Sequence, residues 1–193
     1  MIHGDLKGVR FQTLSAGLLP NASSTKANIL IDDSCRARIA DFGLLTFISD
    51  PANPTASSSI VGAGTTRWMS PELLYPEKFG CGDGRPTKES DCYALGMVIL
   101  EVLTGRSPFA GHSEIDVMQR VTSGKRPERP KEQWSTDDLW KTLKQCWSPR
   151  PNRRPTVDAV LECLGRVSMP LQFPSSSVTN AFDWTSIVGR VPQ

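Results

Sequence analysis

The sequence has few features of a membrane protein or a secreted protein. Its longest apolar run, Ala94–Leu100, is far shorter than the roughly 20 residues that a transmembrane helix needs. The N-terminus, M-I-H-G-D, has no signal-peptide pattern. The five cysteines are an odd number without C-x-x-C spacing, so neither a zinc site nor a disulfide framework is predicted. We expect an intracellular, cytoplasmic protein with reduced thiols and no membrane insertion.

A strong charge of either sign is also missing. The net charge is +2 and no basic run stands out, which gives no reason to expect nucleic acid as a partner. With 38% hydrophobic and 22% charged residues, the composition is that of a soluble globular protein. A chain of 193 residues is long enough for one domain with a core of its own.

Hydrophobic periodicity predicts a mainly α fold. Lys88–Thr104 is apolar nearly all round, which is typical of a helix in the middle of a domain; Ser90 or Asp91 can cap its start, and Gly105 follows its end. Upstream, two short apolar runs flank a D-D-S turn and predict a small β-hairpin, and the C-terminal residues 169–193 have the composition of a disordered tail. The hairpin strands are Ile29–Ile31 and Cys35–Ile39, and the other predicted helices are Ser113–Ser123, Ser135–Cys146 and Thr156–Val167.

Five short motifs follow one another along the chain. They are H-G-D-L-K (His3–Lys7), D-F-G (Asp41–Gly43), G-T-T-R-W-M-S-P-E (Gly64–Glu72), S-D-C-Y-A-L-G (Ser90–Gly96) and C-W-S-P-R-P-N-R-R-P-T (Cys146–Thr156). One such motif is a weak signal, but the ordered set resembles the successive landmarks of the C-terminal lobe of eukaryotic protein kinases. The resemblance implies a protein-kinase-like C-lobe, taken from a parent fold of the α+β class with two lobes.

The resemblance also implies which residues carry the chemistry. Asp5 would accept or orient the proton of the substrate hydroxyl, Lys7 would neutralise charge on the transferred phosphoryl group, and Thr65 would hold both on the substrate side. Asn28 and Asp41 would bind Mg²⁺ together with ATP, because carboxylate and amide oxygens suit this hard cation.

Six further residues are implied to support the site. His3 and Phe42 would belong to an internal hydrophobic stack, and Gly43 completes D-F-G. Asp91 would accept backbone N–H groups of the catalytic loop, and Glu72 and Arg154 would form a buried ion pair. Gly4 departs from the family pattern, because it stands where the family has the arginine that pairs with a phosphate on the activation loop.

Details of the motifs resemble two classes of kinase. Lys7 after D-L and the Gly64-Thr65 pair resemble serine/threonine kinases, whereas R-W-M-S-P-E and C-W…R-P-T resemble tyrosine kinases. This mixture is typical of the tyrosine-kinase-like (TKL) group, whose members mostly phosphorylate serine and threonine. We therefore expect an ATP-dependent serine/threonine protein kinase, a signalling transferase whose partners are ATP and protein substrates with Ser or Thr hydroxyls.

The catalytic-loop motif is interrupted in this sequence. Removing Val9–Lys26 leaves H-G-D-L-K-G-A-N-I-L-I-D, which has the family spacing H-x-D-L-K-x-x-N. Val codons begin with GT and a Lys codon can end in AG, so we favour a retained intron, while a functional insertion and a decayed pseudogene stay open. A functional insertion is disfavoured because Asp5 and Asn28 must both lie around one phosphoryl group, and a shift of about 1 Å can cost on the order of 10²-fold in rate.

The resemblance covers residues 1–168 and begins at the catalytic loop. No Gly-rich phosphate loop, V-A-I-K lysine or αC glutamate precedes that loop here, so the N-terminal lobe is missing from the chain as written. We therefore expect the 193-residue chain itself to be inactive. The competing hypothesis is a non-catalytic scaffold, a kinase-like C-lobe that binds partners.

Overall fold

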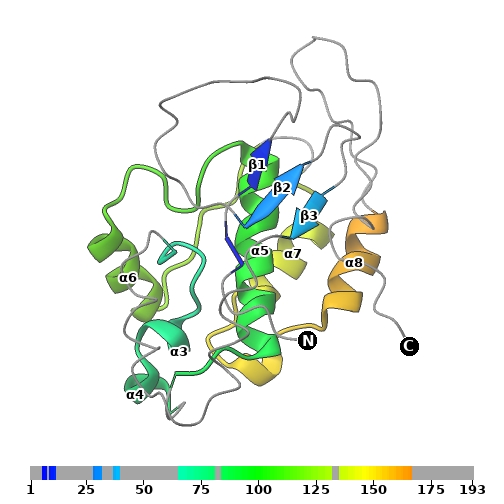
Figure 1. Ribbon diagram of the computed structural model, residues 1–193. Coiled ribbons are helices and arrows are strands. Elements are labelled where there is room, and N and C mark those ends of the chain that lie inside the picture. The colour runs from blue at the N-terminus through cyan, green and yellow to red at the C-terminus, as the bar shows by residue number, and fades with distance from the viewer. Residues whose placement is uncertain are drawn as a thin grey trace.

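The part of the chain that the structure describes is mainly helical, as the sequence predicts (Figure 1). The computed structural model describes residues 6–7, 9–11, 28–31, 37–39, 65–80, 84–131 and 135–166. Its helices are α3 (Pro71–Leu74), α4 (Pro76–Phe79), α5 (Lys88–Thr104), α6 (Glu114–Thr122), α7 (Asp137–Cys146), the short 3₁₀ helix η1 (Pro151–Arg153) and α8 (Val157–Arg166). Its strands are β1 (Val9–Phe11), β2 (Ile29–Ile31) and β3 (Ala37–Ile39).

Helix α5 runs through the middle of these elements, between α3, α4 and α6 on one side and α7 and α8 on the other (Figure 1). Its bounds, Lys88–Thr104, confirm the prediction. The N-cap residue is Thr87 rather than the predicted Ser90 or Asp91, but Ser90 does take part in the cap as the third residue of a capping box. Thr87 Oγ1 accepts from the Ser90 backbone N–H at 3.1 Å, and Ser90 Oγ accepts from the Thr87 N–H at 2.8 Å. The helix ends at Gly105, whose φ of 65° favours glycine.

The core of the described part is built around α5. Tyr93, Met97 and Ile99 are completely shielded from solvent, and burial of a large apolar side chain contributes about 1.5–3 kcal/mol. Close packing between α5 and the end of α7 depends on Gly96. A Cβ atom there would lie 2.7 Å from Trp147 Nε1, so no larger residue fits without a shift of its neighbours.

The other three long helices confirm the prediction to within two residues. The Ser113 side chain caps α6 by accepting from the Asp116 backbone N–H. The start of α7 lies two residues beyond the predicted Ser135, because the Thr136 hydroxyl accepts from the Leu139 N–H at 3.3 Å and acts as the cap. Each helix turns one apolar face to the core: Val117 and Val121 of α6, Leu139 and Leu143 of α7, and Val160 and Leu164 of α8.

The three strands form one small sheet in the order β1-β2-β3. β1 pairs parallel with β2, with Val9 opposite Ile29, and β2 pairs antiparallel with β3, with Ile29 opposite Ile39. The residues that connect β2 and β3 lie outside the described part, so the hairpin as a whole stays a prediction. β1 belongs to the predicted insert Val9–Lys26, and its pairing shows that the first residues of this insert fit beside β2.

Two other predictions concern membranes and the tail. Within the described ranges, none of the helices has the length and apolar character needed to cross a bilayer. The tail, residues 169–193, lies outside these ranges.

Candidate active site

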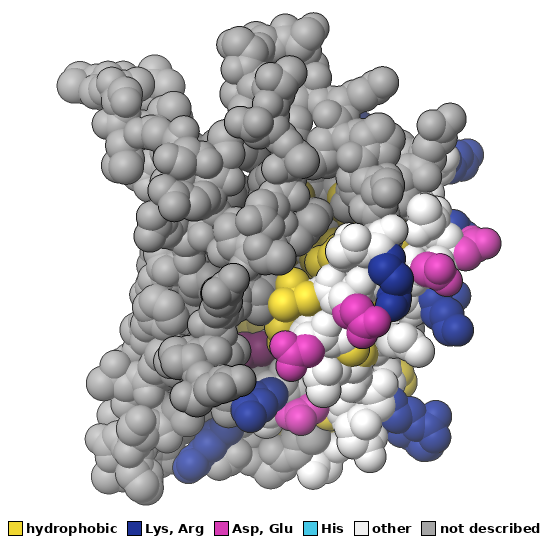
Figure 2. All heavy atoms as spheres, turned by 90° about the vertical axis from the view of Figure 1, so that its right-hand side faces the viewer, with side chains coloured by type: hydrophobic (Ala, Val, Ile, Leu, Met, Phe, Trp, Pro, Cys, Tyr) yellow, Lys and Arg dark blue, Asp and Glu magenta, His cyan; other side chains and the backbone are white. Residues whose placement is uncertain are grey.

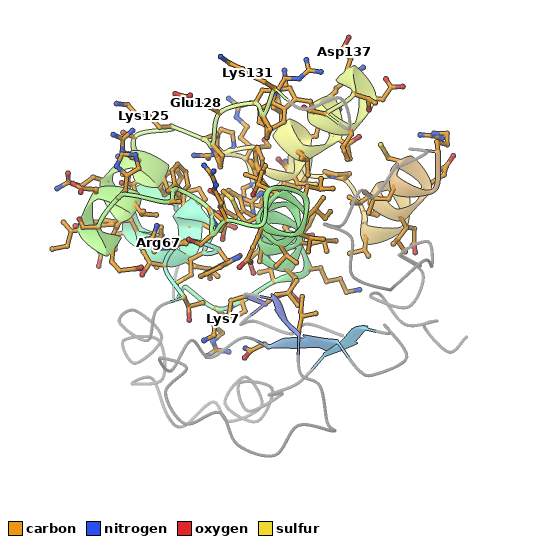
Figure 3. The ribbon with its side chains drawn as sticks, turned by 90° about the horizontal axis from the view of Figure 1, so that it is seen from above. Lys7, Arg67, Lys125, Glu128, Lys131 and Asp137 are labelled. Atoms are coloured by element: carbon orange, nitrogen blue, oxygen red, sulfur yellow. The ribbon has the colours of Figure 1, made fainter. Side chains whose placement is uncertain are left out.

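Lys7 and Thr65 are in contact although they are 58 positions apart in the sequence. Lys7 Nζ donates to Thr65 Oγ1 at 2.7 Å, and both side chains are buried. Thr65 is held by a turn, because its carbonyl accepts from the Trp68 N–H at 3.0 Å. Figure 3 shows Lys7 on the side of α5 that carries the strands. The structure thus brings together two residues to which the sequence analysis gives catalytic roles.

Asn28 lies beside the same lysine. Its backbone N–H donates to the Lys7 carbonyl at 2.9 Å, and its side chain is 1% exposed, immediately before β2 begins at Ile29. An amide oxygen is a suitable ligand for Mg²⁺, so the donor chemistry at this position fits the metal that the family uses. Its predicted companion Asp41 lies outside the described residues. Those residues contain no cluster of three or more His, Cys, Asp or Glu side chains that could hold a metal ion.

Asp91 lies in the first turn of α5 and is half-buried. It lines a small cavity of about 10 Å³ together with Leu6, Thr65 and Ser90. Such a volume holds about one water molecule. The cavity places Asp91 next to Leu6, which the motif assigns to the catalytic loop. Its predicted bonds to backbone N–H groups of that loop stay a prediction, because Asp5 is not among the described residues.

Glu72 and Arg154 form a bidentate ion pair. Arg154 Nη1 lies 2.5 Å from Glu72 Oε1, and Nη2 donates to Oε2 at 2.7 Å. The Arg154 side chain is fully shielded and that of Glu72 is 5% exposed. The guanidinium also donates to the carbonyls of Glu89 and Ser148 at 2.9 and 3.0 Å. The pair joins α3 to the loop before α8 and to the start of α5.

Four predicted site residues lie outside the described ranges besides Asp41, so their roles stay predictions. They are His3, Asp5, Phe42 and Gly43.

Sequence reasoning missed one residue that the structure makes prominent. Arg67 Nε contacts Glu114 Oε1 at 3.0 Å, and its other nitrogens donate to the carbonyls of Pro108, Phe109 and His112 at 3.1, 2.8 and 2.5 Å. Next to it, Trp68 Nε1 donates to Glu101 Oε2 at 3.0 Å. The sequence carries no local signal for this network, because every partner of Arg67 is more than 40 residues away.

In the middle of α5, two guanidinium groups lie against the ring of Tyr93. The Cζ atoms of Arg126 and Arg154 lie 5.4 and 5.2 Å from the ring centroid, within the range of cation–π attraction. Burial raises the pKa of Tyr93 to about 12, although the two arginines act in the opposite direction. Nearby, a hydrogen bond with Cys146 lowers the pKa of the Cys92 thiol, and the same bond together with burial raises the pKa of Cys146.

Among the described residues on the face that carries α8, charges of the two signs are mixed. Figure 2 shows Lys and Arg side chains interspersed with Asp and Glu side chains on this face. This agrees with the small net charge of the chain.

Comparison with known proteins decides the family. The family model of protein tyrosine and serine/threonine kinases matches residues 25–164. The chain belongs to this family. Protein R818 of Acanthamoeba polyphaga mimivirus, named for a serine/threonine-protein kinase/receptor, is 30% identical over 83% of this chain. Two further relatives are drkB of Dictyostelium discoideum, named for a probable serine/threonine-protein kinase, at 30% over 82% of the chain, and the human proto-oncogene tyrosine-protein kinase ROS, at 37% over 66%.

These relatives are much longer than the chain. It spans 9% of the mimivirus protein, 21% of drkB and 5% of human ROS. A protein kinase is a transferase, and the family acts on protein substrates with ATP and Mg²⁺. The family relationship applies to the helical part and the residues next to it, from residue 25 to residue 164.

Proposed function

We propose that these residues belong to a serine/threonine protein kinase of the TKL group, which transfers the γ-phosphoryl group of ATP to Ser or Thr hydroxyls of proteins. The observation that carries the proposal is the 2.7 Å hydrogen bond from Lys7 Nζ to Thr65 Oγ1. The lysine after D-L and the threonine after Gly64 are the two features that resemble serine/threonine kinases, and here they contact each other. The named serine/threonine kinases among the relatives support the same acceptor class.

The mechanism assigns each residue a separate task. The Lys7 ammonium, buried and oriented by Thr65, stabilises negative charge on the group being transferred, and a low-dielectric surrounding strengthens that effect. Asn28 and Asp41 would hold Mg²⁺, which would supply the positive charge needed to offset the phosphates of ATP. Asp5 would orient the substrate hydroxyl and take its proton. Catalysis of this kind depends mainly on position, so Thr65 contributes by fixing the lysine.

The test uses the full gene product encoded by the mature transcript. It is incubated with radiolabelled ATP, Mg²⁺ and dephosphorylated casein, and the labelled amino acid is identified. We expect phosphoserine and phosphothreonine. Lys7→Met should lower kcat on the order of 10²–10³-fold, as expected for loss of a group that stabilises the transition state. Phosphotyrosine as the sole product, or a Lys7→Met variant as fast as wild type, would contradict the proposal.

Matched variants separate chemistry from folding. Thr65→Val removes the hydroxyl that accepts from Lys7, whereas Thr65→Ser keeps it, so the serine variant should retain most of the activity that the valine variant loses. Lys131→Met replaces an exposed lysine on the opposite side of α5 and should leave kcat unchanged (Figure 3).

We also propose that Val9–Lys26 is a retained intron. The support is the sequence pattern, because removal of the segment in frame restores the family spacing H-x-D-L-K-x-x-N, and the family match, which begins at residue 25, leaves out both most of this segment and the motif before it. Sequencing of the mature transcript tests the proposal. A message that joins the Gly8 codon to the Ala27 codon supports it. A message that retains the segment favours a functional insertion or a decayed gene.

The second candidate function is a non-catalytic scaffold. The observation in its favour is that the core around α5 and the buried Glu72–Arg154 pair are complete, although the catalytic-loop motif is interrupted. A full gene product that binds ATP or a protein partner without detectable turnover would favour this function over the kinase.

A further inference from the structure

Arg67 joins two segments that are far apart in the sequence. On one side is the turn Thr65–Met69, in which the Trp68 and Met69 N–H groups donate to the carbonyls of Thr65 and Thr66 at 3.0 and 3.3 Å. On the other side is the loop Ser107–His112, which leads into the cap of α6. Figure 3 shows Arg67 on the side of α5 where α3 and α6 lie.

The contacts of Arg67 need the shape of a guanidinium group. Two of its nitrogens donate to three carbonyls of a single loop, those of Pro108, Phe109 and His112. Charge-assisted bonds of this kind are stronger than neutral ones, and the Arg67 side chain is only 16% exposed. The ion pair with Glu114 is secondary, because Glu114 is 45% exposed and solvent screens it. A lysine at this position has one nitrogen and cannot reach all three carbonyls.

The loop has a conformation that needs support. Phe109 has φ 54°, a value that is uncommon for any residue with a side chain and strained for a bulky one. Its carbonyl accepts the shortest of the two bonds from Arg67 Nη1, and its neighbours in the loop are joined by an Ala110 N–H bond to the Ser107 carbonyl. Arg67 therefore stabilises the loop in the one conformation in which its carbonyls converge.

The same residue fixes the turn that presents Thr65. Arg67 is an inner residue of this turn, and its neighbour Trp68 is anchored to Glu101 of α5. Thr65 in turn accepts from Lys7. Arg67 therefore connects the loop before α6 to the turn whose first residue, Thr65, contacts Lys7.

We infer that Arg67 is a positioning residue that holds the turn Thr65–Met69 against the loop Ser107–His112 and thereby sets the affinity for the polypeptide substrate. The inference rests on the proposed kinase function, because it assigns the turn to the substrate side of the site. Arg67 itself touches neither ATP nor the reacting atoms in this account. Its loss should weaken binding of the protein substrate, whereas binding of ATP should not change.

A kinetic comparison tests this role in the full gene product. For Arg67→Lys we expect KM for dephosphorylated casein to rise about tenfold, with KM for ATP unchanged, which corresponds to about 1.4 kcal/mol of binding. Arg150→Lys, at an exposed arginine, is the matched control and should behave as wild type. An unchanged KM for casein, or equal increases in KM for casein and ATP, would overturn the inference.

Hydrogen exchange gives a readout that does not depend on activity. In the same Arg67→Lys protein, backbone amides of residues 65–69 and of residues 107 and 109–112 should both exchange about tenfold faster, while those of α8 should keep the wild-type rate. Faster exchange in the loop alone would show that Arg67 does not position the turn and would overturn the inference. A wild-type protein that fails to phosphorylate casein contradicts the proposed function and the effect on substrate affinity, while exchange still decides whether Arg67 couples the two segments.

Discussion

Helices α5 and α8 contain similar residue types in different surroundings. Each contains a glycine, Gly96 in the middle of α5 and Gly165 in the last turn of α8, and each is close to an Arg–Glu pair. Around α5 the glycine is in contact with Trp147 and the ion pair is buried, whereas around α8 the space beside the glycine is open and the ion pair is exposed. The contribution of a residue to stability therefore depends on its surroundings rather than on its type.

The largest difference should appear at the ion pairs. Glu72→Gln leaves the Arg154 guanidinium buried without its countercharge, and breaking a buried pair in this way costs roughly 3–5 kcal/mol. Glu162→Gln breaks the exposed pair with Arg166, whose side chains are 73% and 67% exposed, and should cost less than about 0.5 kcal/mol. Urea unfolding of both variants measures the free energies.

A similar loss of unfolding free energy in the two variants would contradict this difference between the buried and the exposed ion pair. A small loss for Glu72→Gln would mean that water reaches Arg154 in solution. A double variant, Glu72→Gln with Arg154→Met, refines the test, because removing both charges should recover much of the stability that the single change loses.

The two glycines should respond to the same substitution with opposite signs. In Gly96→Ala the new Cβ would meet Trp147 Nε1 at 2.7 Å and Cys146 Cβ at 2.8 Å, and such overpacking costs about 1–3 kcal/mol. In Gly165→Ala the new Cβ has nothing within 4 Å, and alanine is more favourable than glycine by about 0.5–1 kcal/mol in the middle of a helix, so in this last turn the gain should be at most of that size. Thermal unfolding of the two variants checks both signs, and destabilisation of similar size in both would contradict the packing argument.

The sequence predicts the long helices well because their signals are local. The bounds of α5 follow from its apolar run and from Gly105, and the other long helices follow from amphipathic faces and capping residues. The cap at Thr87 is missed because Ser90 and Asp91 are equally good capping residues by type. The helices α3 and α4 are not predicted at all, because four residues are too few to show a periodicity.

The candidate site likewise contains contacts that could be predicted from the sequence and contacts that could not. Resemblance to the kinase family pairs Glu72 with Arg154 and places Thr65 on the side of Lys7, although neither composition nor spacing relates residues so far apart. The contacts of Arg67 lie outside both kinds of reasoning. Its partners are mostly backbone carbonyls, and a carbonyl at a given position has the same chemistry whichever side chain the sequence has there.

The smallest change in stability at neutral pH should follow removal of the hydroxyl group of either tyrosine, one of which is buried and the other exposed. Tyr93 of α5 is fully buried, and in the described part its hydroxyl has no hydrogen-bond partner, whereas Tyr75 beside α3 is 50% exposed. Replacing a buried hydroxyl that has no partner is close to neutral or stabilising, so Tyr93→Phe should be at least as stable as wild type at pH 7. Tyr75→Phe should also have the wild-type stability there.

Alkaline pH should separate the two tyrosines. An unfolded chain loses the phenolic proton near pH 10, but burial raises the pKa of Tyr93 to about 12 in the folded protein. Between these pH values the folded state holds a proton that the unfolded state has lost, so stability falls as the pH rises. Tyr93→Phe should remove this part of the decline, which urea unfolding at intervals from pH 9 to pH 12 would show. An equally steep decline in Tyr93→Phe would mean that the phenol is not buried in solution. Because the chain has two tyrosines, the tyrosinate absorbance of the Tyr75→Phe variant reports the titration of Tyr93 alone.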